Sequence, residues 1–190
     1  MPNWCSTSYR VRGPKVQVDE LFDTMTDLGN MRAPLLENGF GTTWLGCLVK
    51  ELGGDPDSVR CRGSWSDLSR CENDHGVISF LTDTAWSRCD EVEDLILSVY
   101  PDLEIFFFEE ELGNGVFATN DHDREFFTED ILIDNNGDMD YYELEGALSR
   151  LSEIKGSPVT SWDEAQAFCD DYNSKAESDD YIYIYRAEHV

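Results

Sequence analysis

Apolar spacing between residues 77 and 108 predicts a strand, a helix and a second strand. Ile78 and Phe80 are typical of an inner strand, because β-branched and aromatic side chains fit a pleated, half-buried surface. Over residues 89–100 the apolar positions recur every three or four residues, which is the spacing of one helix face. The next predicted strand, over residues 103–108, completes a unit of strand, helix and strand.

A similar set of elements precedes this unit. Loose alternation predicts a strand over residues 6–11, and helical spacing predicts a helix over residues 16–28. Residues 41–49 fit a second strand or a buried connection. Residues 51–74 show no period and predict an irregular insertion with Trp65 as its large anchor. The resulting βαββαβ order is that of the ferredoxin-like fold. We therefore expect an α+β protein with an antiparallel sheet and its helices on one face.

The rest of the chain, residues 121–190, carries a different pattern. Residues 130–142 predict a strand, a tight turn, and either a returning strand or the start of a helix. Two segments with helical spacing follow, and Ser161 or Thr160 is the expected N-cap of the second. We expect this part to form an acidic α/β extension that packs on or extends the sheet of a domain formed by residues 1–120.

The clearest alternation in the chain runs over residues 180–186. If Ile182 and Ile184 face a core, Tyr181, Tyr183 and Tyr185 line the opposite surface, where they could form a dimer contact. We expect this strand to extend the larger sheet or to pair with the strand predicted around Ile131–Ile133.

The second half of the chain is strongly acidic. The 190 residues carry a formal net charge of −26. Residues 91–190 hold 27 acidic and 5 basic residues, so most of the excess lies there. Such a field repels nucleic acid and anionic lipid, and attracts a basic protein surface. The acidic residues that we single out as a candidate partner-binding surface are Glu109, Glu110, Glu111, Asp121, Asp123, Glu129, Asp130, Asp170, Asp171, Asp179 and Asp180.

Little in the sequence points to catalysis. No Ser/His/Asp or Cys/His constellation is evident, so we expect no enzymatic activity and no cofactor. The six cysteines include no CxxC pair, and the spacing of Cys61, Cys71 and His75 matches no zinc pattern. The N-terminus lacks the features of a secretory signal, and no apolar run approaches the roughly 20 residues of a membrane helix. We expect a cytoplasmic protein with reduced thiols.

One stretch offers a weak metal hypothesis. Asp134, Asn136 and Asp138, with Glu145 at the twelfth position, echo the spacing of a calcium-binding loop. The template requires glycine at the sixth position, whereas Gly137 stands two positions earlier. A hairpin turn explains the same residues.

Several short motifs resemble, in order, the YubB-like ferredoxin-fold family carried by phages and plasmids. These motifs are Met1–Cys5 with Val11–Gly13, Gly41–Trp44, Asp83–Ser87 with Tyr100–Leu103, and Glu109–Ala118. The resemblance covers roughly residues 1–120 and departs from the family pattern at Phe40 and at Arg88-Cys89. It implies a ferredoxin-like domain from a mobile-element setting, without an established activity.

Five residues belong to the shared pattern: Trp4, Gly41, Trp44, Asp83 and Trp86. The three tryptophans and the carboxylate could form an aromatic pocket for a small ligand. Alternatively they are structural, with Trp86 fastening the following helix to the sheet and Asp83 holding the exit turn. We favour the structural interpretation.

Carboxylates arrayed on a surface can imitate a nucleic acid, which carries one charge per about 1.7 Å of duplex. Together with the family resemblance, this favours an acidic inhibitor of a nucleic-acid-binding partner. The expected partner is a basic protein surface, such as that of a nuclease, a restriction enzyme or an RNA-guided effector, and the expected role is anti-defence, such as anti-CRISPR or anti-restriction activity. The alternative is an accessory interaction domain whose acidity serves solubility. The oligomeric state is left open.

Overall fold

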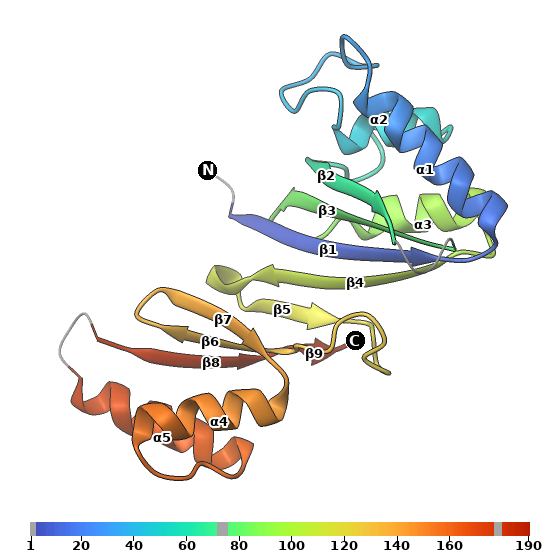
Figure 1. Cartoon of the computed structure of the whole chain (residues 1–190). Helices are drawn as coiled ribbons and strands as arrows, with labels where there is room; N and C mark the ends of the chain where they lie inside the picture. The colour runs from blue at the N-terminus through green and yellow to red at the C-terminus, as the bar shows by residue number, and fades with distance from the viewer. Residues whose placement is uncertain (1–2, 72–75, 177–179) are drawn as a thin grey trace. The chain divides into compact units, whose positions relative to one another are not determined.

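A computed structural model describes residues 3–71, 76–176 and 180–190. These residues form an α+β structure with five α-helices, and the expected α+β class is confirmed (Figure 1). The chain divides into two compact units, residues 1–120 and residues 121–190. Within the described ranges, no helix combines the length and apolar character needed to cross a membrane.

The first unit is built around an antiparallel sheet. Its described elements are β1 (Trp4–Arg12), α1 (Lys15–Gly29), α2 (Leu45–Glu51), β2 (Gly63–Arg70), β3 (Val77–Ala85), α3 (Asp90–Val99), β4 (Glu104–Glu111), the 3-10 turn η1 (Leu112–Asn114) and β5 (Val116–Thr119). These strands lie in the order β2-β3-β1-β4-β5, and each neighbouring pair is antiparallel.

One face of this sheet forms a core with α1, α2 and α3 (Figure 1). Successive strand residues point to opposite faces, so Tyr9 and Val11 of β1 share the inner face with Phe80 and Ile78, their partners on β3. The helices contribute apolar residues at helical spacing: Val18, Leu21, Met25 and Leu28 from α1, and Val92 and Ile96 from α3.

The structure decides between the two alternatives for residues 41–49 and corrects the prediction for residues 51–74. Residues 45–51 form the helix α2, a buried connection and not a strand, and a short, continuously apolar run does not distinguish a buried helix from a buried strand. Residues 63–70 form the strand β2 and not an irregular insertion. An irregularity between Ser66 and Ser69, with Asp67 at a φ of 52°, interrupts the alternation that would have revealed this strand. Trp65 is buried, as expected of an anchor.

The second unit contains a smaller sheet. Its described elements are β6 (Ile131–Asn135), β7 (Asp138–Tyr142), α4 (Leu144–Lys155), α5 (Trp162–Lys175), β8 (Ile182–Arg186) and β9 (Glu188–His189). Three strands form an antiparallel sheet in the order β7-β6-β8. The strand and tight turn predicted for residues 130–142 are confirmed, and of the two alternatives that follow the turn the returning strand is the one observed. The pairing of the last predicted strand with the Ile131–Ile133 strand is also confirmed, since Ile184 lies opposite Ile133.

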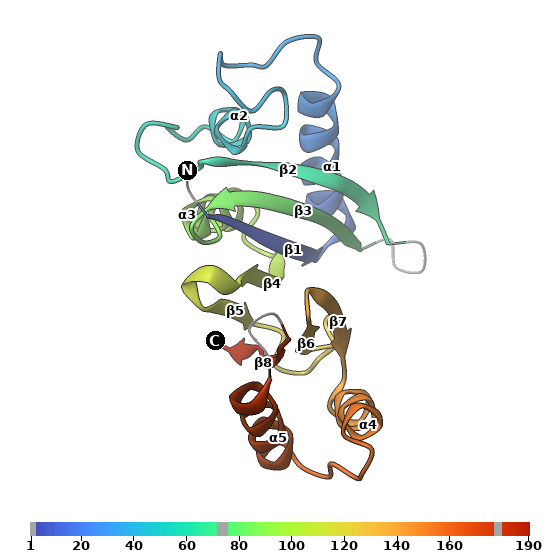
Figure 2. The same ribbon diagram turned by 90° about the vertical axis from the view of Figure 1, so that its left-hand side faces the viewer.

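Helices α4 and α5 lie on the same side of the three-stranded sheet (Figure 2). The core between them contains Ile131, Ile133, Leu151, Ala165 and Ile182. The Ser161 hydroxyl accepts the backbone N–H of Glu164 at 3.2 Å, which confirms Ser161 as the N-cap of α5. Because Ile182 and Ile184 face this core, the tyrosines of the strand line the opposite surface, as the alternation predicted, and Tyr183 is 47% exposed.

Candidate functional site

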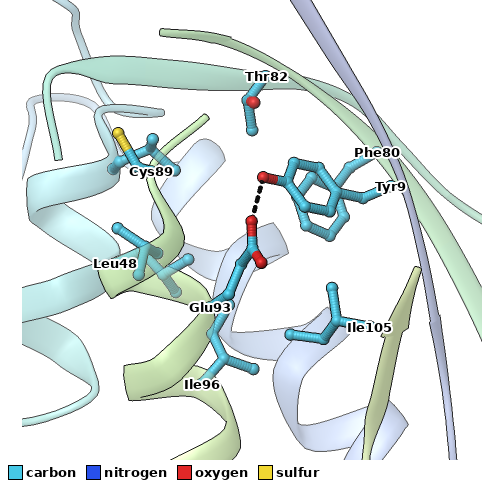
Figure 3. A pocket seen from close by; sticks show the side chains of 10 residues that line it. Tyr9, Leu48, Phe80, Thr82, Cys89, Glu93, Ile96 and Ile105 are labelled. Atoms are coloured by element: carbon cyan, nitrogen blue, oxygen red, sulfur yellow. Dashed lines mark hydrogen bonds between the residues drawn. The ribbon is translucent and has the colours of Figure 1, made fainter. Parts of the chain in front are cut away.

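A small cavity lies between the sheet and the helices α2 and α3 of the first unit (Figure 3). Its lining includes Tyr9, Phe80 and Thr82 from strands, Leu48 from α2, and Glu93 from α3. The cavity has a volume of about 20 Å³, and a buried water needs at least about 10–15 Å³. It therefore has room for about one water molecule and not for a substrate.

A buried hydrogen-bond network borders this cavity. The Tyr9 hydroxyl donates to Glu93 Oε1 at 2.7 Å, and Arg88 Nη1 donates to Glu93 Oε2 at 2.6 Å (Figure 3 shows the first of these bonds). Arg88 also lies 3.5 Å from a Glu109 carboxylate oxygen and stacks over the ring of Phe107, with its central carbon 3.9 Å from the ring centroid. The network connects β1, β4 and α3.

Burial dominates the electrostatics of the network. Loss of water raises the pKa of Glu93, although the hydrogen bonds from Tyr9 and Arg88 oppose this rise. Burial also raises the pKa of Tyr9 well above its ordinary value, and the negative charge of Glu93 acts in the same direction. Both groups therefore favour their neutral forms more than they would in water.

Two more polar groups line the same cavity. Cys89 is buried, and desolvation raises its pKa to about 11, so its thiol stays protonated near neutral pH. The buried Thr82 hydroxyl has no hydrogen-bond partner among the residues that the structure describes. The thiol is protonated and the cavity has space for a single water, while the Tyr9–Glu93 hydrogen bond beside it joins α3 to the sheet.

The tryptophans of the family pattern are not all core residues. Trp4 is 46% exposed and Trp86 is 51% exposed, contrary to the expectation that Trp86 packs in the core and fastens α3 to the sheet. Trp86 adopts a φ of 75°, a left-handed conformation that residues with bulky side chains rarely adopt. Its backbone N–H donates to the backbone carbonyl of Asn3. The ring of Trp4 contacts Phe40 edge to face, with the centroids 6.1 Å apart. Asp83 is exposed on β3.

Trp44 differs from the other two tryptophans because it is half-buried and packs against the main core. Its indole Nε1 is buried and has no hydrogen-bond partner within the described ranges. A Cβ at Gly46 would lie 2.4 Å from atoms of this ring, so only glycine fits beside it. Gly41 has a φ of 83°, in the left-handed region that glycine favours. Trp44 and Gly41 are therefore structural residues of the segment that leads into α2.

The acidic residues singled out from the sequence separate into two groups. The exposed ones are Asp123, Glu129, Asp170, Asp171 and Asp180. The partly or fully buried ones are Glu109, Glu110, Glu111, Asp121 and Asp130. Asp179 lies outside the described residues. The exposed carboxylates face solvent, where a partner can reach them, but Asp171 pairs with Lys175 and Asp180 accepts hydrogen bonds from Tyr172 and Asn136. The buried group is engaged in the protein's own structure.

Asp121 and Asp130 show what the buried carboxylates do in the second unit. The Asp121 carboxylate accepts the backbone N–H groups of residues 125, 126 and 127 at 3.0, 2.7 and 2.9 Å. Asp130 is fully buried, and its Oδ2 lies 2.6 Å from Arg124 Nη2 and 3.7 Å from Arg186 Nε. These contacts organise the segment that precedes β6.

The basic residues of the second unit are occupied internally. Arg124 and Arg186 approach Asp130, while Arg150 and Lys175 pair with carboxylates on their own helices. Lys155 lies over the ring of Phe168. The exposed carboxylates of this unit that lie outside the candidate partner-binding set are Glu125, Asp138, Asp140, Glu143, Glu145, Glu153, Asp163, Glu164 and Glu188. The charge count revealed the acidity of this segment, but only the structure shows which carboxylates face solvent.

The stretch considered as a calcium loop forms the β6–β7 hairpin. Asn136 and Gly137 have φ angles of 58° and 88°, and Asp134 Oδ1 accepts the N–H of Gly137 at 2.8 Å. Asn135 pairs with Asp138 across the turn, and Glu145 lies in α4. In the described part of the chain, no group of three or more His, Cys, Asp or Glu side chains could hold a metal ion. His75, whose spacing from Cys61 and Cys71 matches no zinc pattern, lies outside that part.

Comparison of the chain with protein-family models, with curated proteins and with solved structures finds no match. The class is therefore defined by structure: an α+β protein with two units, the second of which presents many exposed carboxylates.

Proposed function

We propose that this chain is a non-enzymatic acidic binding protein that occupies the basic, nucleic-acid-binding surface of a partner protein. The observation that carries the proposal is the charge arrangement of the second unit. In this unit, Arg124 and Arg186 lie beside the buried carboxylate of Asp130, whereas most of the other carboxylates face solvent. A surface of one sign attracts an oppositely charged partner over a distance and accelerates their association.

The topology of the first unit supports a ferredoxin-like assignment. Its first four strands lie in the order β2-β3-β1-β4, with all neighbours antiparallel and with α1 and α3 packed on one face. The motifs that resemble the YubB-like family are consistent with this fold and suggest a mobile-element origin. The partner that we propose is accordingly a nuclease, a restriction enzyme or an RNA-guided effector, and the role is anti-defence in the cytoplasm.

A second candidate function rests on the exposed tryptophans. Trp4 and Trp86 present large aromatic surfaces to solvent, and aromatic residues are enriched at protein contacts. An accessory interaction domain that uses the Trp4/Trp44/Trp86 corner, for a protein or a small ligand, would not require nucleic-acid mimicry. Its acidity would then serve solubility.

Affinity capture separates the two functions. The immobilised full chain is incubated with nuclease-treated host lysate at low salt, and bound proteins are eluted stepwise with NaCl or with duplex DNA. Mimicry predicts that the captured proteins bind nucleic acid, that duplex DNA releases them, and that retention falls steeply as salt screens the contact. Capture that resists salt and DNA would contradict mimicry and support the accessory domain.

Matched variants sharpen this experiment. Replacing three exposed carboxylates of the second unit (Asp138→Asn, Asp140→Asn and Glu143→Gln) should weaken capture. Replacing three exposed carboxylates of the first unit (Glu20→Gln, Asp27→Asn and Glu51→Gln) changes the net charge equally and should have a smaller effect. Equal effects of the two triple variants would show that only total charge matters.

A further inference from the structure

The outer edge of β8 borders a groove in the second unit. β8 is an outer strand of the sheet β7-β6-β8, and α5 packs beside it (Figures 1 and 2). The groove between them has a volume of about 210 Å³. It is lined by Gln166, Cys169, Asp170 and Asn173 of α5 and by Tyr183 and Ile184 of β8.

At one end of the groove, Asn173 takes the place of a neighbouring strand. Its Nδ2 donates to the carbonyl oxygen of Ile182 at 2.9 Å, and its Oδ1 accepts the N–H of Ile182 at 2.8 Å. A side-chain amide has the same donor and acceptor as a peptide group, so this pair reproduces two bonds of a β-ladder. The edge of β8 is therefore already geometrically suited to pairing.

Ile184 is the next residue of β8 whose backbone N–H and C=O point away from β6. In an antiparallel pair, alternate residues direct their N–H and C=O groups to the same neighbour. Tyr181 and Ala187 bond toward the β6 side, so even-numbered residues of β8 direct their backbone groups outward, as Ile182 does. Among the described residues, no hydrogen-bond partner is found for the outward N–H and C=O of Ile184.

We propose that this groove binds an extended peptide segment that pairs with β8 at Ile184 and places a lysine or arginine side chain against Asp170. Strand addition at a sheet edge obtains affinity from main-chain hydrogen bonds and specificity from side-chain positions. Asp170 is exposed and lines the groove, so its carboxylate can pair with that cation. The site goes beyond the proposed function, because it does not require the partner to bind nucleic acid.

Charge complementarity determines the choice of occupant. Residues 121–190 contain 19 acidic and 5 basic residues. A second copy of the chain would bring two equally acidic edges together, and like charges across an interface oppose association. A cationic strand has the opposite charge and can satisfy the same backbone groups.

The test uses the full chain and a fluorescein-labelled peptide of sequence Thr-Val-Lys-Val-Lys-Val-Thr, followed by fluorescence anisotropy. We expect saturable binding and slower amide hydrogen exchange at Ile184. Asp170→Asn should weaken binding about three- to fivefold, whereas Asp171→Asn should change it less than about twofold. Asp171 is the matched control because it lies next on the same helix, carries the same charge and does not line the groove.

Two peptide controls separate strand pairing from simple charge attraction. N-methylation of both lysines and the central valine retains the charge but removes the backbone donors that can face β8, and it should abolish binding. Replacement of both lysines by glutamate should also abolish binding. Equal binding of the N-methylated peptide, equal effects of the two aspartate variants, or no binding up to about 1 mM peptide would each overturn the proposal. A dimer in sedimentation, together with slow amide hydrogen exchange at Ile184 in the absence of peptide, would assign the edge to a second copy of the chain. That result would overturn the proposal as well.

Discussion

The Tyr9 hydroxyl donates a 2.7 Å hydrogen bond to the Glu93 carboxylate and thereby joins β1 to α3 across 84 positions of sequence. Arg88 donates to the other carboxylate oxygen at 2.6 Å. A carboxylate withdrawn from water depends on such donors, since an unsatisfied buried charge is costly. The packing of α3 on the sheet therefore depends on a few polar atoms as well as on the apolar core.

Tyr9→Phe should destabilise the protein by about 1.5–3 kcal/mol, the usual contribution of a hydrogen bond to a charged group. The measurement is urea unfolding at pH 7, followed by tryptophan fluorescence. Tyr183→Phe is the control, because its ring is half-exposed and its loss should change stability by less than about 0.5 kcal/mol. A similar loss in both variants would show that the bond to Glu93 has no special importance.

The stability difference between the wild type and Tyr9→Phe should shrink as the pH rises above about 10. Burial raises the pKa of Tyr9 in the folded state above its unfolded value. The stabilisation is therefore complete below the unfolded pKa and is lost as the pH rises toward the folded pKa, because the unfolded tyrosine ionises first. Unfolding free energies of both proteins at pH 8, 10 and 11 test this. A constant difference would contradict it.

Asp130→Asn should destabilise the second unit by about 3 kcal/mol, because it leaves two arginines beside a neutral, fully buried side chain. Hydrogen exchange of the amides in β6 and β8 measures the effect locally. Asp123→Asn removes the same charge from an exposed site of the same unit and should change stability by less than about 0.5 kcal/mol. Comparable loss of protection in both variants would assign the effect to net charge.

Trp86→Gly should be more stable than Trp86→Ala by about 1 kcal/mol. The backbone at this position has a φ of 75°, which is strained for residues with a Cβ and unstrained for glycine. Both substitutions remove the exposed indole, so their difference isolates the backbone. Thermal unfolding of the two variants provides the measurement, and equal stabilities would indicate that the turn relaxes.

Cys71 should react with iodoacetamide before the other cysteines of the native protein. Burial raises the pKa of Cys5, Cys89 and Cys169 to about 11, so little thiolate exists at pH 8, and Cys61 is shifted in the same direction. Cys71 is the one that is not buried. Mass spectrometry of tryptic peptides during a time course identifies the order. Early labelling of Cys89 would contradict the burial of the cavity that it lines.

The spacing of apolar residues predicted the elements that bury one face and expose the other. The helices α1 and α3 and the strand β8 were predicted because each buries one face, so their apolar residues recur with the period of the element. Pattern did not decide between a strand and a buried connection at α2, whose first five residues are all buried, and it failed at β2, where an irregularity breaks the period. In both segments the decisive contacts come from distant parts of the chain.

By itself, the sequence determined the α+β class, the tight turn between β6 and β7, the alternation that places the tyrosines of β8 on one face, and the concentration of negative charge after residue 90. Tertiary structure alone decided which carboxylates are structural, as with Asp121 and Asp130, and placed Asn173 against the edge of β8. The physical reason is that periodicity and composition are local properties, whereas burial and hydrogen-bond partnership depend on residues that only folding brings together.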